Sequence, residues 1–175
     1  MTDRNRSQLG QDNWVLEQLK YKRDGTFVDI GCATPTFWSN TSKLELEYGW
    51  RGIGIDVKYD AQAWSVRPNT KVYQENAVTF DYIKAFEEND LPEIIDYLNV
   101  DLEPPTITFE AFKALPHDRY KFRTITFEQD AYRMPMGGWT GSGEEWKKYT
   151  REYICSLGYT FVREVTQDDW YVLRD

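Results

Sequence analysis

Apolar positions follow two periodicities along the chain, and their alternation predicts an α/β fold. Five short apolar runs lie between residues 27 and 127, and each ends at a polar residue or at glycine. The segments between them carry apolar residues at helical spacing. Short buried runs separated by helical patterns are typical of parallel strands joined by helices. The strands predicted in this part are Phe27–Ile30, Gly52–Asp56, Lys71–Gln74, Ile94–Val100 and Phe122–Phe127.

Capping residues indicate where the helices begin and end. Thr34–Pro35 puts a cap residue before a proline at the first helical position, and Gly49 ends the same predicted helix. Ser142 and Glu145 have the spacing of a capping box, which predicts a helix ending at Gly158. Further helices are expected at Trp14–Leu19, Thr79–Phe86 and Thr106–Leu115.

Two more strands close the chain. Tyr159–Val162 and Trp170–Leu173 are separated by a short gap, which predicts an antiparallel pair. The expected fold is therefore Rossmann-like: a mostly parallel seven-stranded sheet with a C-terminal antiparallel hairpin and helices on both faces. We expect residues 1–11 to form a polar tail and residues 12–175 to form one domain, as the length of 175 residues favours.

Composition narrows the expected partners and compartment. The net charge of −8 disfavours a phosphate backbone, so we expect no nucleic-acid partner. The opening residues are polar and no apolar run has membrane-spanning length, which predicts no signal peptide, no membrane partner and a cytoplasmic protein. The two cysteines are expected to be reduced thiols. Nothing in the sequence indicates an oligomeric state.

Acidic residues gather at the ends of the predicted strands. Asp56 ends the second strand, Asp101 follows the fourth and Glu128 follows the fifth, while Asp29 lies within the end of the first. In a parallel sheet, ligands bind outside the carboxyl ends of the strands. These acids are therefore expected on the rim of one binding site, although polar loops alone would explain any single one.

The first of these loops has the features of a nucleotide-type cofactor site. Gly31 follows a buried strand directly, so the backbone can turn tightly there and approach a ligand, with Cys32 beside it. Asp56 follows at roughly the spacing at which an acid reaches ribose hydroxyls. A nicotinamide dinucleotide remains an alternative, disfavoured because the second and third glycines of G-x-G-x-x-G are absent. Asn76 and Ala77 follow the third strand, where this type of fold meets the adenine.

The order of the motifs resembles that of the FkbM-type methyltransferases, which use S-adenosylmethionine (SAM). The similar segments extend from Phe27 to the C-terminus. They are Phe27–Gly31, Ser39–Thr41, Tyr48–Ile53, Ile95–Glu103, Thr124–Arg133, Arg151–Tyr159 and Asp168–Val172. The resemblance implies a class I SAM-dependent methyltransferase that acts on a hydroxyl of a sugar, glycan or small natural product.

This resemblance assigns roles to the acids and to the loops beyond them. Asp101, Glu103 and Glu128 are candidates for the general base, and Asp101 is also a candidate for holding the amino group of SAM. The loop after the fifth strand is expected to bind the acceptor, through Tyr132, Arg133 and Trp139. An ordinary loop that tucks Trp139 into the core is the alternative. His117, the only histidine, is expected to be a solvated loop residue.

A metal site is weighed against simpler roles for the same acids. The oxygen ligands of Asp101, Glu128 and Asp130 suit Mg²⁺, which would acidify a bound hydroxyl. Pairing of these acids with SAM or with Arg133 is the interpretation we favour. The chain also departs from the family at Thr34–Thr36, which lacks a glycine, and at Pro104–Pro105. A SAM-binding protein of this fold without catalysis, acting as a regulatory or partner subunit, is therefore the second hypothesis.

Overall fold

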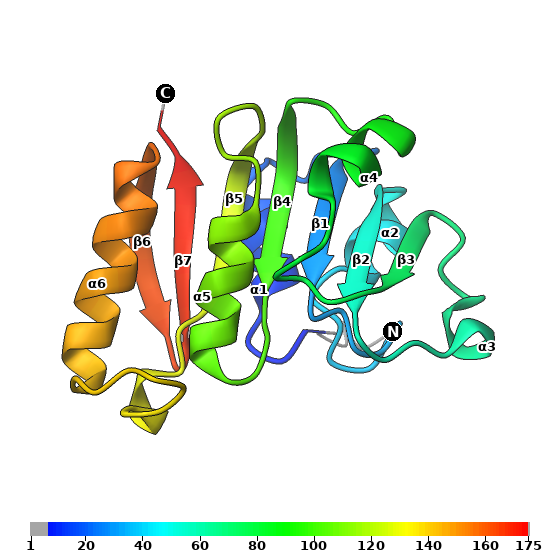
Figure 1. The fold of residues 1–175 in the computed structure, drawn as a ribbon. Coiled ribbons are helices and arrows are strands. Elements are labelled where there is room, and N and C mark those ends of the chain that lie inside the picture. Colours follow the sequence, from blue (N-terminus) through cyan, green and yellow to red (C-terminus); the bar gives the residue numbers. More distant parts are fainter. Residues whose placement is uncertain (1–6, 175) are drawn as a thin grey trace.

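A computed structural model describes residues 7–174, in which seven strands form one sheet. The strand order is β3-β2-β1-β4-β5-β7-β6 (Figure 1). The first five pair in parallel, whereas β7 runs antiparallel to both β5 and β6. The strands are β1 (Thr26–Ile30), β2 (Arg51–Asp56), β3 (Thr70–Gln74), β4 (Ile94–Val100), β5 (Lys121–Glu128), β6 (Tyr159–Val165) and β7 (Asp168–Leu173). The Rossmann-like fold predicted from the sequence is confirmed.

Helices cover both faces of this sheet. Helices α4, α5 and α6 lie on the face toward the viewer in Figure 1, and α1 and α2 lie behind it. The helices are α1 (Gln11–Gln18), α2 (Ser42–Tyr48), α3 (Ala61–Trp64), α4 (Tyr82–Glu88), α5 (Pro105–Ala114) and α6 (Gly143–Ser156), with a 3₁₀ turn, η1, at Ala131–Arg133. The capping box predicted for α6 is present, since Ser142 and Glu145 each bond to the other's backbone N–H.

Alternation along the central strands divides the core between these two layers. In β1, Val28 and Ile30 pack toward α4 and α5, whereas Phe27 packs toward α1 and α2. Strand β4 repeats the pattern, with Leu98 on the first face and Tyr97 on the second. Because the central strands are buried on both faces, they read as continuous apolar runs in the sequence.

Helix α2 begins later than its capping pattern predicts. The sequence predicts a start at Thr34–Pro35, but residues 31–41 form a loop and the helix begins at Ser42. The N-cap position is Thr41, seven residues downstream of Thr34, and the Ser39 hydroxyl accepts hydrogen bonds from the backbone N–H groups of Thr41 and Ser42 just before the helix. Trp38 has a φ of 53°, which no helix residue adopts. The extra length makes this loop a wall of the site.

The N-terminal segment also contributes to the folded structure. The predicted polar tail spans residues 1–11, of which the first six lie outside the described residues. Ser7 is buried and donates a hydrogen bond to Asp12 at 2.6 Å. Gln11 is buried and donates to Asp168 of β7 at 2.9 Å. Within residues 7–174, every helix is too short or too polar to span a membrane.

A buried ion pair connects the segment before β3 to α2. Arg67, in the segment before β3, donates to the Glu45 carboxylate, and both side chains are almost fully buried. The remaining Arg67 donors bond to the Pro35 carbonyl at 2.7 Å, the Ser39 hydroxyl at 3.3 Å and the Thr41 hydroxyl at 3.1 Å. Arg67 therefore fixes both ends of the 35–41 loop from below.

We expect Arg67→Met to lower the free energy of unfolding by about 3–5 kcal/mol, because it removes the counter-charge of the buried Glu45 carboxylate, which keeps only its hydrogen bonds from Asn69 and Thr70. Urea unfolding followed by circular dichroism measures this change. Arg119→Met is the matched control: Arg119 pairs with Glu87 at the surface, so its loss is expected to cost within about 1 kcal/mol. Equal losses in the two variants would contradict the role assigned to Arg67.

Candidate functional site

A cavity of about 190 Å³ opens at the carboxyl edge of the parallel strands. Its walls come from three parts of the chain: Gln8 before α1, residues 31–40 of the loop after β1, and Asn99 and Asp101 at the end of β4. Asp29 lies at its floor. This edge is the lower one in Figure 1, where the arrowheads of β1 and β4 point. The cavity is therefore where ligands of such sheets bind.

Gly31 makes the close approach of two strand ends possible. Its φ is +82°, and a Cβ on it would lie 1.8 Å from the Asp101 carbonyl oxygen. Its backbone N–H bonds to Ile55, while Asp101 N–H bonds to Ile30. Only glycine fits this crossing. The glycine predicted to turn the chain after β1 thus lies on the cavity wall, in contact with the end of β4.

A row of polar side chains crosses three central strands beneath the cavity. Asp29 of β1, Asn99 of β4 and Thr126 of β5 are register partners, and they face the α1 and α2 side. Asn99 donates to one Asp29 oxygen at 2.8 Å, and Thr41 donates to the other at 2.7 Å. Burial raises the pKa of Asp29, although these donors act in the opposite direction.

The hydrogen bonds in this row fix the orientation of each amide. A carboxylate only accepts, so Asn99 must present its amino group to Asp29. The Asn99 oxygen then accepts from Thr126 at 2.8 Å and from the Asn40 amino group at 3.0 Å. The Asn40 oxygen is left buried without a hydrogen-bond partner, and Asn40 lines the cavity. A buried acceptor of this kind requires a donor from a ligand or from water.

The residues predicted to hold a nucleoside continue along the same edge. Asp56, at the end of β2, accepts from the backbone N–H of Ala33 at 2.9 Å and of Lys58 at 2.8 Å. Asn76 is exposed in the loop after β3, where its side chain accepts from Val78 N–H, and Ala77 is buried beside it. Asp56 is joined to the cavity through Ala33, whereas Asn76 and Ala77 lie outside its lining.

Cys32 has a packing role on the cavity wall. It is buried, and a Cβ built on Gly54 would lie only 2.9 Å from its sulfur, so the thiol packs against β2. Burial raises the pKa of this thiol, with the nearby carboxylates acting in the same direction. Cys32 therefore contributes to the shape of the cavity wall as a neutral thiol and carries no charge there.

Asp101 and Glu128 form a carboxyl pair at the ends of β4 and β5. Burial raises the pKa of Glu128 to about 10, assisted by its hydrogen bond to Asp101 and by repulsion from that acid and from Asp130. Burial also raises the pKa of Asp101. Two adjacent buried carboxylates do not both ionise near neutral pH, so the pair shares one proton and carries one negative charge.

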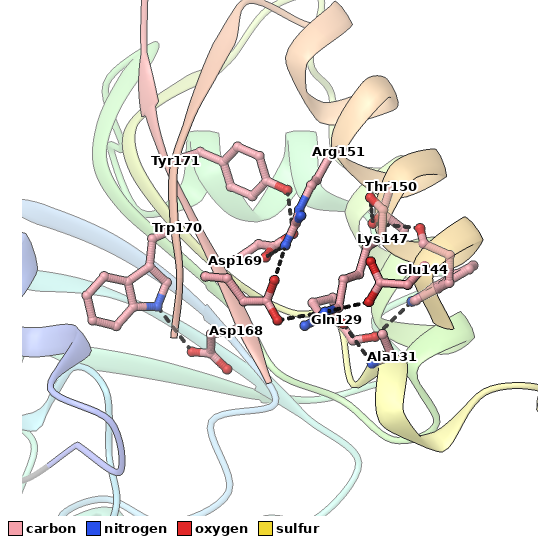
Figure 2. A network of polar contacts seen from close by, with 12 residues as sticks. Gln129, Ala131, Glu144, Lys147, Thr150, Arg151, Asp168, Asp169, Trp170 and Tyr171 are labelled. Atoms are coloured by element: carbon pink, nitrogen blue, oxygen red, sulfur yellow. Dashed lines mark hydrogen bonds and ion pairs between the residues drawn. The ribbon is translucent and has the colours of Figure 1, made fainter. Parts of the chain in front are cut away.

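Asp168 brings a third acid to this part of the site. It is the register partner of Glu128, and it accepts from Gln11 of α1 at 2.9 Å. Burial raises its pKa to about 7. Figure 2 shows how β7 is held: Arg151 of α6 donates twice to the adjacent Asp169, both times at 2.7 Å. This two-pronged contact fixes β7, and hence Asp168, beside β5.

Arg133 neutralises the remaining candidate acids. It bonds to Glu103 at 2.8 Å and to Asp130 at 3.1 Å, and so joins the loops after β4 and β5. Among residues 7–174, no group of three or more His, Cys, Asp or Glu side chains is arranged to hold a metal ion. The Asp101, Glu128 and Asp130 set proposed for Mg²⁺ therefore does not fit one, and no step of the chemistry is assigned to a metal.

Two residues predicted to bind the acceptor lie apart from the cavity. Tyr132 is 78% exposed beside Arg133 on η1. Trp139 stacks on Tyr149 at 5.4 Å and packs edge-on against Trp146, over the groove between α5 and α6. Trp139 thus follows the alternative in which the loop tucks it against the core, because the aromatic face of α6 is the nearest apolar surface.

His117 is not the solvated loop residue that its sequence context predicts. It is buried against Phe112, with Nε2 2.7 Å from the Phe112 carbonyl oxygen. Burial lowers its pKa. The turn after α5 lies at the amino edge of β5, opposite the cavity, so this imidazole packs the core and takes no part in the site.

Several residues of the site were not predicted individually. Asn99 lies inside an apolar strand and Asn40 inside a presumed helix, so neither position suggested a ligand contact. An asparagine in a buried strand next to a strand-end acid is nevertheless a usable signal, because buried amides need partners. The others not predicted are Gln8, Phe37, Trp38 and Asp168.

Comparison with known structures supports the fold. The MycE methyltransferase of mycinamycin biosynthesis, solved with Mg and S-adenosylhomocysteine (SAH), aligns over 93% of this chain and 47% of its own, with TM-score 0.65 and 9% identity. A SAM-dependent methyltransferase from Geobacter sulfurreducens, also with SAH, aligns over 93% and 68%, with TM-score 0.53 and 13% identity. No family model and no curated protein sequence matches the chain. The chain has the fold of the class I SAM-dependent methyltransferases.

One comparison corrects the expected partners. A protein named as a ribosomal RNA methyltransferase, from Plasmodium falciparum, aligns over 97% of both chains with TM-score 0.55 and 14% identity. The prediction of no nucleic-acid partner, made from net charge, is therefore wrong as an exclusion. Net charge averages over the whole surface and does not determine what one edge of a sheet binds.

We expect the Asp101–Glu128 pair to make the protein less stable as pH rises. Between about 4.5 and about 10, folded Glu128 keeps a proton that the unfolded chain has lost, so the free energy of unfolding falls with pH. One proton corresponds to at most about 1.4 kcal/mol per pH unit. Glu128→Gln is expected to flatten this slope between about pH 8 and 9.5, which lies above the pKa of about 7 at which Asp168 loses its proton.

Urea unfolding at a series of pH values measures this slope. Glu152→Gln, which changes an exposed carboxylate of α6, is the control and is expected to keep the slope of the unchanged protein. An unchanged slope in Glu128→Gln would show that the shared proton is not held there.

Proposed function

We propose that this protein is an FkbM-type SAM-dependent methyltransferase whose acceptor group is a hydroxyl. The observation that carries the proposal is the unpartnered, buried oxygen of Asn40, a residue that lines the cavity together with Asp29 and Asp101. A buried acceptor among carboxylates fits a positively charged donor. The ammonium group at the amino-acid end of SAM has this chemistry, so the residues present fit the cofactor.

The rest of the cofactor is expected to follow the carboxyl edge toward β2 and β3. Asp56 would accept hydrogen bonds from the ribose hydroxyls, and the loop with Asn76 and Ala77 would meet the adenine. Gly31 leaves room for the chain of the cofactor to pass over the crossing of β1 and β4. Asp29, Cys32 and Asp101 would line the amino-acid end. The nicotinamide alternative gains no support, since this cavity is acidic and would repel a pyrophosphate.

Bound SAM supplies a methyl group made electrophilic by its positively charged sulfur. This chain must align the acceptor oxygen behind that methyl and receive the hydroxyl proton. The Asp101–Glu128 pair retains one negative charge at neutral pH, so it can accept a proton. We assign Asp101 as the residue that receives the hydroxyl proton. It would take up the proton that the acceptor hydroxyl gives up as its oxygen is methylated. We do not assign this role to Glu103, because it forms an ion pair with Arg133.

A SAM-binding protein without transfer remains the second candidate, and one observation favours it. The pair nearest the expected methyl position already holds a proton, which weakens it as a base. Firm SAH binding combined with no turnover on hydroxyl acceptors would support this second function.

Calorimetric titration with SAH tests the proposed function. We expect SAH to bind the unchanged protein. Asn40→Leu and Asp56→Asn are each expected to weaken binding about 10- to 150-fold, because each removes a hydrogen bond to a charged or buried polar group worth about 1.5–3 kcal/mol. Asp118→Asn, at the opposite edge of the sheet, is the control. Absence of SAH binding to the unchanged protein would refute the proposal.

An analogue of SAH that lacks the amino group tests whether Asn40 contacts that group. Asn40→Leu is expected to lower affinity for SAH but to leave affinity for this analogue unchanged. Equal losses for both ligands would show that Asn40 acts through the shape of the cavity rather than by accepting from an ammonium.

A further inference from the structure

We propose that the stacked pair Phe37–Trp38, at the mouth of the cavity, binds a planar ring of the methyl acceptor. The two rings are stacked, with centroids 4.6 Å apart and an interplanar angle of 26°. Both line the cavity that also contains Asp29 and Asp101. The inference rests on the proposed function, since it names the class of acceptor that this methyltransferase would use.

The exposure of these rings is not explained by folding. Phe37 is 66% exposed and Trp38 is 62% exposed, although aromatic side chains of this size usually bury 150–250 Å² each. Six aromatic side chains are strongly exposed among the described residues. Four of these six lie in loops at the carboxyl edge; the six are Tyr21, Phe37, Trp38, Tyr59, Tyr132 and Tyr149. Exposed aromatic surface is therefore concentrated along this edge of the sheet, and of the six only Phe37 and Trp38 line the cavity.

The backbone holds Trp38 in this position at an energetic cost. Its φ of 53° lies in the left-handed region, which a bulky residue adopts only under constraint. The constraint comes from both sides of the pair. Arg67 bonds to the Pro35 carbonyl before it and the Ser39 hydroxyl after it, and Thr34 donates to the Phe37 carbonyl. The rings are thus presented by a fixed loop rather than by a loose one.

The chemistry of the surroundings selects the occupant. The apolar area is limited to two rings bordered by polar Gln8, Thr34 and Ser39, which is far below the area that a stable protein partner buries. Aromatic side chains favour flat rings as partners, because any flat ring has a face that can stack on them whatever its substituents. The carboxylates of the cavity disfavour an anionic group on the ring. A flat, uncharged or positively charged ring is therefore the ligand that fits.

A ring of this kind could be a nucleobase or a phenol, and four probes distinguish these sources from a sugar. Adenosine and cytidine present nucleobases, catechol presents a phenolic ring, and glucose presents hydroxyls on a ring that is not flat. The protein is labelled with ¹⁵N at its tryptophan indoles and saturated with SAH, so that adenosine does not enter the cofactor site. We expect at least one planar probe, but not glucose, to shift the Trp38 indole resonance, which Trp38→Phe identifies by its loss.

Alanine variants measure the contribution of the pair. Trp38→Ala is expected to weaken the bound planar probe about 5- to 150-fold, and Trp38→Phe to restore most of the affinity. Tyr21→Ala is the matched control, because Tyr21 is also an exposed aromatic at positive φ but lies before β1, at the opposite edge. SAH affinity is expected to be the same in all variants.

Each other result has a separate meaning. If no planar probe shifts Trp38 while SAH binds, the inference fails and the proposed function stands. If glucose shifts it as strongly as the planar probes, the ring assignment is overturned. If Trp38→Ala weakens SAH instead of the probe, the pair belongs to the cofactor and the inference is again overturned. If SAH does not bind the unchanged protein, the proposed function itself fails.

Discussion

A carboxylate buried at the end of the central strand sets the requirements for the rest of this edge. Asp29 is 2% exposed, and each of its oxygens needs a donor, because an unpaired buried carboxylate is strongly unfavourable. Asn99 and Thr41 supply those donors. Thr41 precedes α2, so the need for a donor also positions that helix. The loop between β1 and α2 must then cover eleven residues, and that length creates the cavity wall.

The same requirement passes from side chain to side chain. Once Asn99 donates to Asp29, its oxygen must face Asn40 and Thr126, and Asn40 then uses its amino group and keeps its own oxygen buried without a partner. Arg67 donates hydrogen bonds to two other acceptors of this loop, the Pro35 carbonyl and the Ser39 hydroxyl. Positive and negative groups are therefore buried together beneath the loop that walls the cavity.

Sequence patterns predicted the central strands well because these strands are buried on both faces. A mostly apolar run such as Ile94–Val100 predicts a buried strand, and a capping box such as Ser142 with Glu145 fixes a helix start. The 31–41 loop was predicted poorly because Thr34–Pro35 has local helix-start chemistry, while the actual start depends on tertiary contacts of Thr41 and Arg67. The strand-end acids reach one edge, but their pairing, Asp101 with Glu128 and Asp130 with Arg133, depends on distances that a sequence does not contain.

The polar row of Asp29, Asn99 and Thr126 also ties the identity of this site to strand alignment. Each member bonds to a neighbour at the same height in the sheet, so a shift of β4 by one residue would place every member opposite an apolar residue. Replacing Asn99 by an apolar residue would leave one oxygen of the buried Asp29 without its donor. Replacing the whole row would still leave the Asn40 amino group and the Tyr97 hydroxyl without their partners, so a change in these strands also requires a change in the loop that walls the cavity.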